Sequence, residues 1–132
     1  DGLRATLLAR LTEEAARLSP APAHASVFGS FARGDADHES DIDILLLAAT
    51  EQTLRQWEVQ VDDLQALVQR WTGNRCSCLV FSVHRAQRLA ADGEPIVDNW
   101  RRDALVLLGE PLDALLQPAR GVGERRTVGR QQ

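Results

Sequence analysis

Two aspartates, Asp41 and Asp43, are separated by one residue at the start of an apolar run. If that run is a β-strand, both carboxylates project from the same face, because successive side chains of a strand alternate. Two acids this close cannot both stay ionised cheaply unless a cation lies between them. Oxygen ligands favour Mg²⁺ or Mn²⁺, which complete their coordination with water and substrate phosphates. The pair therefore predicts a metal site in which both residues are ligands.

A glycine and a serine precede this pair, at the end of a short β-prone run. Gly29 lets the backbone approach a ligand closely, and the amides of a helix beginning at Ser30 favour an anion. A Walker P-loop is excluded, because Gly34 is followed by Asp35 where that motif needs lysine. A dinucleotide fingerprint is also absent. A phosphate-binding turn beside a metal site implies a metal–nucleotide site.

The elements around these residues predict an α/β or α+β domain with one small mixed sheet flanked by helices. Apolar residues at helical spacing and short β-prone runs alternate along the chain, with no internal repeat. Residues 53–56 have the form of a capping box, so the longest helix is expected to begin there and to stop at Gly73. Helices are predicted over residues 3–18, 30–33, 54–72, 83–91 and from 94 onward, and strands over 25–28, 41–47, 75–81 and 104–108, followed by a last turn over 111–116.

The length and composition set limits on the domain and its partners. The chain has 132 residues, 44% of them apolar, which is enough for one core: we expect a domain over residues 1–116 and a disordered Arg/Gly-rich tail over 117–132. With 19 acidic and 15 basic residues, and four of those bases in the tail, the domain is too acidic to bind nucleic acid directly. The chain begins without Met, which indicates a fragment or a processed product.

Location follows from what the chain lacks. It contains no apolar run of membrane-spanning length and no signal-peptide pattern, so no membrane contact is expected. Cys76 and Cys78 are too close to bridge on a strand, so we expect two apolar thiols in a reducing compartment. The predicted location is cytoplasmic.

Two motifs follow one another closely, reading GSFARG over residues 29–34 and SDID over residues 40–43. Together they resemble the signature of the DNA polymerase-β-type nucleotidyltransferases, in their minimal bacterial form. The resemblance extends over roughly residues 3–116 and implies the fold of that superfamily. It also implies a Mg²⁺- or Mn²⁺-dependent transfer of a nucleoside monophosphate from a nucleoside triphosphate to a hydroxyl, with release of pyrophosphate.

The resemblance assigns a role to each motif residue. Gly29 and Ser30 would hold the phosphates of the nucleotide, and Arg33, in the same turn, would brace the loop acids. Asp41 and Asp43 would be the catalytic metal ligands. For partners, the resemblance implies either an antitoxin-like pairing with a helical toxin or fusion behind a DNA-binding domain.

One residue departs from the family pattern. The family carries a third carboxylate on a later strand, and the equivalent position here is Ser77; residues 64–91 contain no acid at all. Without that general base, catalysis should be slower by about 10²- to 10⁴-fold. Two functions therefore stay open, namely a weakened nucleotidyltransferase and a nucleotide-binding regulatory module without turnover.

The remaining polar and aromatic residues have plainer interpretations. Asp35, Asp37, His38 and Glu39 are expected in a solvated loop, although one of them could replace the missing acid. The other candidates are predicted to be structural or surface residues: His24 and His84 at the ends of elements, Trp57 and Trp71 in the core, and Arg70, Arg75, Arg85 and Arg88 on a solvated surface or, alternatively, at a phosphate or a partner.

Overall fold

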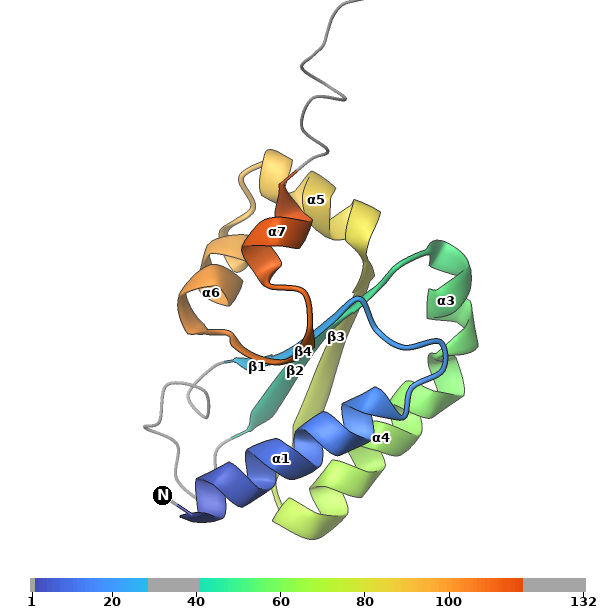
Figure 1. Cartoon of the computed structure of the whole chain (residues 1–132), viewed down its shortest axis with the longest axis vertical. Helices are drawn as coiled ribbons and strands as arrows, with labels where there is room; N and C mark the ends of the chain where they lie inside the picture. The colour runs from blue at the N-terminus through green and yellow to red at the C-terminus, as the bar shows by residue number, and fades with distance from the viewer. Residues whose placement is uncertain (1, 29–40, 118–132) are drawn as a thin grey trace, which may run out of the picture.

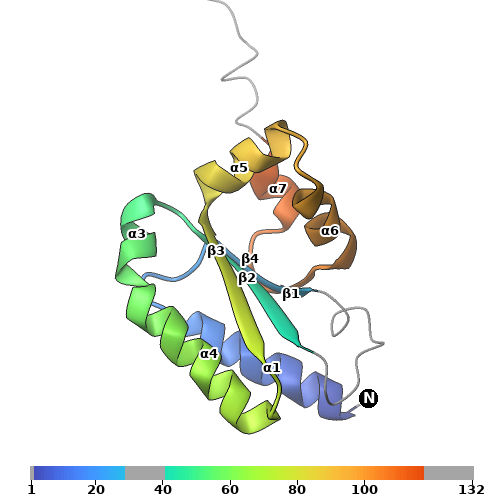
Figure 2. The same cartoon turned by 180° about the vertical axis from the view of Figure 1, so that it is seen from behind.

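A four-stranded mixed sheet with helices on both faces forms the protein (Figures 1 and 2). The computed structural model describes residues 2–28 and 41–117, and the helix expected over 30–33 and the tail after residue 117 lie outside them. The α/β architecture predicted from the sequence is confirmed. The elements run α1 (Gly2–Ala16), β1 (His24–Phe28), β2 (Ile42–Ala48), α3 (Glu51–Gln56), α4 (Glu58–Thr72), β3 (Cys76–Ser82), α5 (Val83–Ala91), α6 (Pro95–Asp103), β4 (Leu105–Gly109) and α7 (Leu112–Leu116).

The sheet has the strand order β3-β2-β1-β4. β1 is antiparallel to both β2 and β4, whereas β2 and β3 are parallel. β2 lies inside the sheet, and its residues 44–48 are buried, as expected of a central strand covered on both faces. The two strands that concern the site, β2 and β3, therefore run side by side in the same direction.

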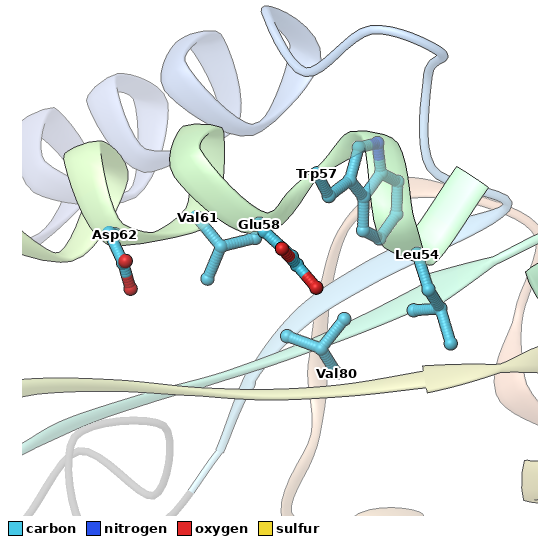
Figure 3. A pocket seen from close by; sticks show the side chains of 6 residues that line it. All are labelled: Leu54, Trp57, Glu58, Val61, Asp62 and Val80. Atoms are coloured by element: carbon cyan, nitrogen blue, oxygen red, sulfur yellow. The ribbon is translucent and has the colours of Figure 1, made fainter. Parts of the chain in front are cut away.

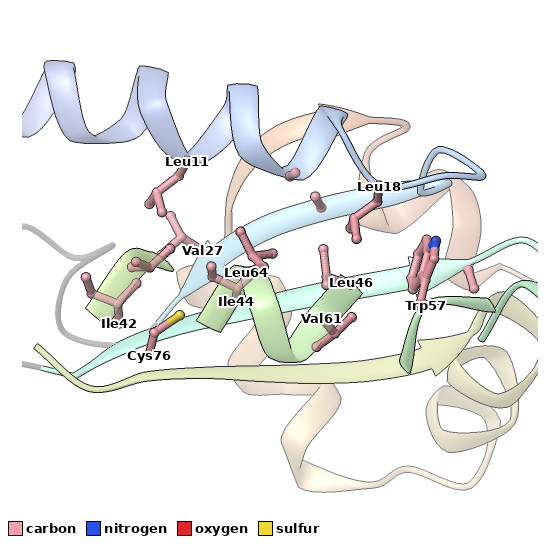
Figure 4. Close-up of a cluster of buried hydrophobic side chains, with 14 residues drawn as sticks. Leu11, Leu18, Val27, Ile42, Ile44, Leu46, Trp57, Val61, Leu64 and Cys76 are labelled. Atoms are coloured by element: carbon pink, nitrogen blue, oxygen red, sulfur yellow. The ribbon is translucent and has the colours of Figure 1, made fainter. Parts of the chain in front are cut away.

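One face of the sheet packs against α1 and α4 (Figure 4). Trp57, at the junction of α3 and α4, is fully buried and donates its indole N–H to the carbonyl of Pro20 over 2.8 Å. This bond ties the segment after α1 to the helix pair. The buried residues on this face are Leu11, Ala15, Leu18, Ala25, Val27, Ile42, Ile44, Leu46, Ala48, Trp57, Val61, Leu64, Val68 and Cys76.

The opposite face is covered by α5, α6 and α7. Leu45 and Leu47 of β2 point to this side, because strand side chains alternate. Trp100 of α6 is fully buried there, with its ring centre 5.6 Å from that of Phe81. The other buried residues of this cluster are Ala86, Val97, Leu112 and Leu116.

The edge of β3 is held by α4. Gln65 and Gln69 lie one helical turn apart, and their side-chain oxygens accept the backbone N–H groups of Cys78 (2.8 Å) and Cys76 (3.4 Å). These bonds satisfy donors that an edge strand otherwise leaves open. They also fix the height of β3 relative to α4, and so the position of the residue between the two cysteines.

The capping-box prediction over residues 53–56 is wrong. The N-cap is Thr50, whose hydroxyl accepts the N–H of Thr53, and Thr53 is itself a buried residue in the first turn of α3. The helix predicted over 54–72 is two helices that meet at Trp57. The predicted stop at Gly73 (φ 75°) and the predicted cap at Ser82 are both confirmed.

Gly109 closes β4 against the start of β1. Its φ is +86°, and a Cβ placed there would lie 2.3 Å from the carbonyl oxygen of Ala23. We expect Gly109→Ala to reduce the free energy of unfolding by about 3 kcal/mol, from backbone strain plus the clash with main chain. Gly93→Ala is the matched control: its φ is +71° but the space around it is open, so we expect a loss of about 1 kcal/mol. If urea denaturation gives the same loss of unfolding free energy for both variants, the clash at residue 109 is contradicted.

His24 makes the fold sensitive to pH. It is fully buried, with Nδ1 2.7 Å from the carbonyl oxygen of Glu110 and Nε2 2.9 Å from the hydroxyl of Ser26. Because a carbonyl only accepts, Nδ1 carries the proton and Nε2 accepts from Ser26. Burial lowers the pKa of His24, partly offset by the Glu110 carbonyl.

The unfolded chain therefore takes up a proton at His24 at higher pH than the folded chain does. We expect the free energy of unfolding to hold above the ordinary histidine pKa of about 6.5 and to fall as the pH drops from 7.5 to 5.5. Urea denaturation at both pH values measures this loss. His24→Gln should show a smaller decrease in the free energy of unfolding between pH 7.5 and pH 5.5, whatever its absolute stability. An unchanged decrease would mean that another group causes the pH dependence.

Candidate metal and nucleotide site

β2 and β3 place four polar side chains together where the two strands begin. In the parallel register, Asp43 is paired with Ser77, and the N–H of Ile42 donates to the carbonyl of Arg75 over 2.8 Å. Asp41 therefore lies next to Arg75 across the strands. By strand alternation, Asp41, Asp43, Arg75 and Ser77 share one face of the sheet. We call these four residues the polar array.

The polar array continues the face that α5, α6 and α7 cover farther along the same strands. Leu45 and Leu47 follow Asp43 at alternate positions of β2, and Leu79 and Phe81 follow Ser77 on β3. The apolar residues bind the helices, whereas the array is left open: Asp41, Arg75 and Ser77 are exposed, and Asp43 is half-buried. This switch from polar to apolar along one face places the array at the rim of a packed core.

Electrostatics at the array favour a cation. Burial raises the pKa of Asp43, and the negative charge of Asp41 raises it further. Both causes disfavour the carboxylate, and a bound cation would remove that penalty. The donor set, two carboxylates with room for water, suits Mg²⁺ or Mn²⁺. The metal site at Asp41 and Asp43 stays a prediction that these features favour.

Arg75 lies beside this pair without occupying it. One of its guanidinium nitrogens is 4.0 Å from an Asp41 carboxylate oxygen, and the two side chains are 73% and 52% exposed. An ion pair so long and so open to water contributes little to stability. A cation binding at Asp41 can therefore displace the guanidinium at little cost.

Ser77 stands where a third carboxylate would face Asp43. Ser77 is paired with Asp43 in the parallel register, and its equivalence to the family's third carboxylate stays a prediction. Within residues 2–28 and 41–117 the structure contains no group of three or more His, Cys, Asp or Glu side chains placed to hold a metal. The described part of the site thus offers two acidic ligands and a hydroxyl.

The phosphate-turn residues Gly29, Ser30 and Arg33 lie outside the described residues, as do the loop acids considered as replacements for the third carboxylate. The chain does leave β1 at Phe28, which is paired with Asp43.

The cysteines that flank Ser77 point away from the array, because they alternate with it along β3. Both are free; Cys76 is buried and Cys78 partly so, which confirms the expectation of unbridged thiols. A hydrogen bond to Cys76, together with burial, raises the pKa of the Cys78 thiol. These thiols are core residues, and a metal-binding role is not indicated.

A separate hollow of about 460 Å³ lies between α3, α4 and β3 (Figure 3). Val80 forms its floor and points to the face of β3 opposite Ser77. The hollow is therefore not part of the array. It is lined by Leu54, Trp57, Glu58, Val61, Asp62 and Val80.

Part of the chain matches a family of known proteins. The family model of the nucleotidyltransferase domain matches residues 8–72, a span that contains Asp41 and Asp43. The resemblance to the nucleotidyltransferases is confirmed. The match supports a nucleotidyltransferase type of function for this domain.

The nucleotidyltransferase-like fold also recurs in a solved structure, described as the crystal structure of a toxin-antitoxin with AMP-PNP. That chain is 20% identical to this one, with a TM-score of 0.52 over 82% of this chain and 80% of the other. At this identity the comparison establishes a shared fold. None of the curated proteins matched the sequence. Among the described helices of the nucleotidyltransferase-like domain, none has the length and apolarity to cross a membrane.

Proposed function

We propose that this domain binds a nucleoside triphosphate together with Mg²⁺ and transfers the nucleoside monophosphate slowly to an acceptor hydroxyl. Asp41 and Asp43 would be the metal ligands, Gly29 and Ser30 would hold the phosphates, and Arg33 would brace the loop. The observation that carries the proposal is the pair of aspartates at the open end of β2, where Asp43 is paired with Phe28, the last residue of β1.

In the reaction, the acceptor oxygen forms a bond to the α-phosphorus, the bond between the α-phosphorus and its bridging oxygen to the β-phosphate breaks, and pyrophosphate leaves. A bound Mg²⁺ would neutralise phosphate charge and lower the pKa of the acceptor hydroxyl. Asp41 and Asp43 would hold the ion, because the direction of their strand puts both carboxylates on one face. Ser77 cannot act as a general base at neutral pH, because its hydroxyl stays protonated. The acceptor proton therefore goes to solvent, and the step is slow.

A second candidate, a regulatory module that binds nucleotide without turnover, is favoured by the same serine. Ser77 is paired with Asp43, where the family's third carboxylate would stand. This alternative keeps the binding site and loses only the chemistry. The two candidates therefore differ in product formation and not in nucleotide binding.

For partners, we propose a protein that completes the acceptor side, either a helical toxin for which this domain serves as antitoxin or a DNA-binding domain fused before it. The shared fold with a protein described as a toxin-antitoxin supports the first. The acidic composition supports protein contact over direct nucleic-acid binding. The two free cysteines support a cytoplasmic location.

The test uses the whole chain with labelled ATP, GTP, CTP and UTP, in Mg²⁺ or Mn²⁺ and in excess chelator. Label incorporated into the protein itself or into an added protein acceptor, and lost with chelator, supports slow transfer. Nucleotide-dependent thermal stabilisation that needs the metal, without incorporation, supports the regulatory module. Neither effect with any of the four nucleotides would contradict both.

A further inference from the structure

Arg75 differs from the other arginines of the folded domain in its position. Residue 75 lies directly before β3, and its carbonyl accepts the N–H of Ile42, which fixes its backbone next to Asp41. Its guanidinium is 4.0 Å from the Asp41 carboxylate and 73% exposed. Its backbone position therefore keeps a positive charge within reach of a ligand that binds at the two aspartates.

The other exposed arginines have different surroundings. Arg85 and Arg88 lie on α5, which follows the far end of β3, and Arg101 and Arg102 of α6 pair with Asp113 and Asp103. Arg75, in contrast, forms an ion pair with Asp41 of the polar array. The sequence places it among four arginines expected on a solvated surface or at a phosphate or a partner, and only the strand register distinguishes it from the others.

The charge on the array must rearrange when a metal binds. If Asp41 coordinates a divalent cation, its negative charge is shared between two cations, so its attraction for the Arg75 guanidinium becomes weaker. The guanidinium can then take another acceptor, and the phosphate oxygens of a metal-bound nucleotide suit it, because the planar guanidinium binds phosphate through two parallel hydrogen bonds. The long, open ion pair makes this exchange easy.

We propose that Arg75 binds a phosphate of the nucleotide and that Asp41 holds it in place until the metal arrives. This inference rests on the proposed function of Asp41 and Asp43 as metal ligands. The proposal predicts that removing the Arg75 side chain has opposite effects on the binding of the metal and on the binding of the nucleotide. A purely structural arginine would not produce this pattern. Removing the guanidinium takes a contact from the nucleotide but frees Asp41 for the metal.

Arg75→Ala tests the proposal in the chain of 132 residues. Titration with Mn²⁺ alone, followed by electron paramagnetic resonance, should give equal or tighter metal binding than in the wild type. Titration with AMP-PNP in the presence of Mg²⁺ should give binding weaker by about tenfold, the usual weight of one charge-assisted hydrogen bond at a partly exposed site. Inorganic pyrophosphate with Mg²⁺ should weaken likewise, and Arg75→Lys should recover part of the affinity.

Arg88→Ala is the matched control, because it removes the same charge from an exposed arginine on α5. It should leave both titrations unchanged. Equal AMP-PNP affinity in wild type and Arg75→Ala would overturn the role of Arg75 while leaving the proposed function intact. Weakening of Mn²⁺ and AMP-PNP together would also overturn it, since that pattern marks damage to the aspartates. A wild-type chain that binds no Mg²⁺–AMP-PNP would overturn both proposals.

Discussion

Asp43→Asn should abolish metal-dependent nucleotide binding and reduce any transfer by at least about 10²-fold, while making the ligand-free domain more stable. The first effect follows from losing a charged metal ligand, since a bound ion contributes several kcal/mol of charge stabilisation during phosphoryl transfer. The second follows from the wild-type site. Burial and the charge of Asp41 both raise the pKa of Asp43, so its carboxylate is disfavoured in the folded state until a cation is present.

The stability effect has a defined pH dependence. Because the pKa of Asp43 is raised in the folded state, the folded chain binds its proton more tightly than the unfolded chain does. The ionised Asp43 carboxylate therefore lowers the stability of the fold fully above its raised pKa. This loss of stability disappears as the pH falls toward the ordinary aspartate pKa of about 3.9. At pH 7 the variant should be more stable by about 0.5 kcal/mol, the usual size of a repulsion between neighbouring like charges, and the difference should close in acid.

Chemical denaturation of the ligand-free proteins at pH 7 and pH 4 measures this difference, and isothermal titration with Mg²⁺–AMP-PNP measures the binding. Asp62→Asn is the matched control, since it removes an equal charge from an exposed site on α4 away from the array. An Asp43→Asn variant that is less stable than wild type, yet still binds nucleotide, would contradict the assignment of Asp43 as a metal ligand.

Ser77→Asp should raise nucleotidyl transfer by about 10²- to 10⁴-fold, the usual contribution of a positioned general base. Ser77 is exposed and paired with Asp43 across parallel strands, so an aspartate there would face the acceptor side of the proposed metal site. It should also tighten Mn²⁺ binding and lower the stability of the metal-free chain, because a third carboxylate joins two existing ones.

Initial rates of label incorporation under Mg²⁺ test this prediction, and Ser77→Asn, which adds similar bulk without charge, separates the carboxylate from its size. Ser77→Asn should leave the rate near that of wild type. If wild-type transfer is already fast and Ser77→Asp abolishes it, the assignment of Ser77 to the third-carboxylate position is wrong. If Ser77→Asp binds nucleotide and metal more tightly but transfers nothing, the regulatory module is the better description.

The sequence predicts the fold correctly wherever interactions between residues close in the chain determine the structure. The apolar run of β2, the left-handed glycine at residue 73 and the hydroxyl cap of Ser82 each act within a few residues, and each prediction is confirmed. The start of α3 was misplaced because Thr50 and Thr53 are both acceptable N-caps. Thr53 is buried among tertiary contacts, and sequence spacing does not reveal burial.

The sequence predicts only part of the site, because some of its contacts join residues that are far apart in the chain. Spacing within one strand predicts that Asp41 and Asp43 share a face, because alternation is a local property. The neighbours that they acquire from β3 depend on a parallel register set across more than 30 intervening residues. The family pattern indicated Ser77 in advance, whereas nothing along the chain separated Arg75 from Arg70, Arg85 and Arg88.

The central claim, that the two aspartates after the first strand hold a divalent cation carrying a nucleotide, is tested most directly by crystals grown with Mn²⁺ and AMP-PNP. We expect a manganese anomalous peak at metal–oxygen bonding distance, about 2 Å, from carboxylate oxygens of both Asp41 and Asp43, next to phosphate density. Nucleotide bound with manganese at some other place, or a bare pair of carboxylates at saturating ligand, would contradict the account.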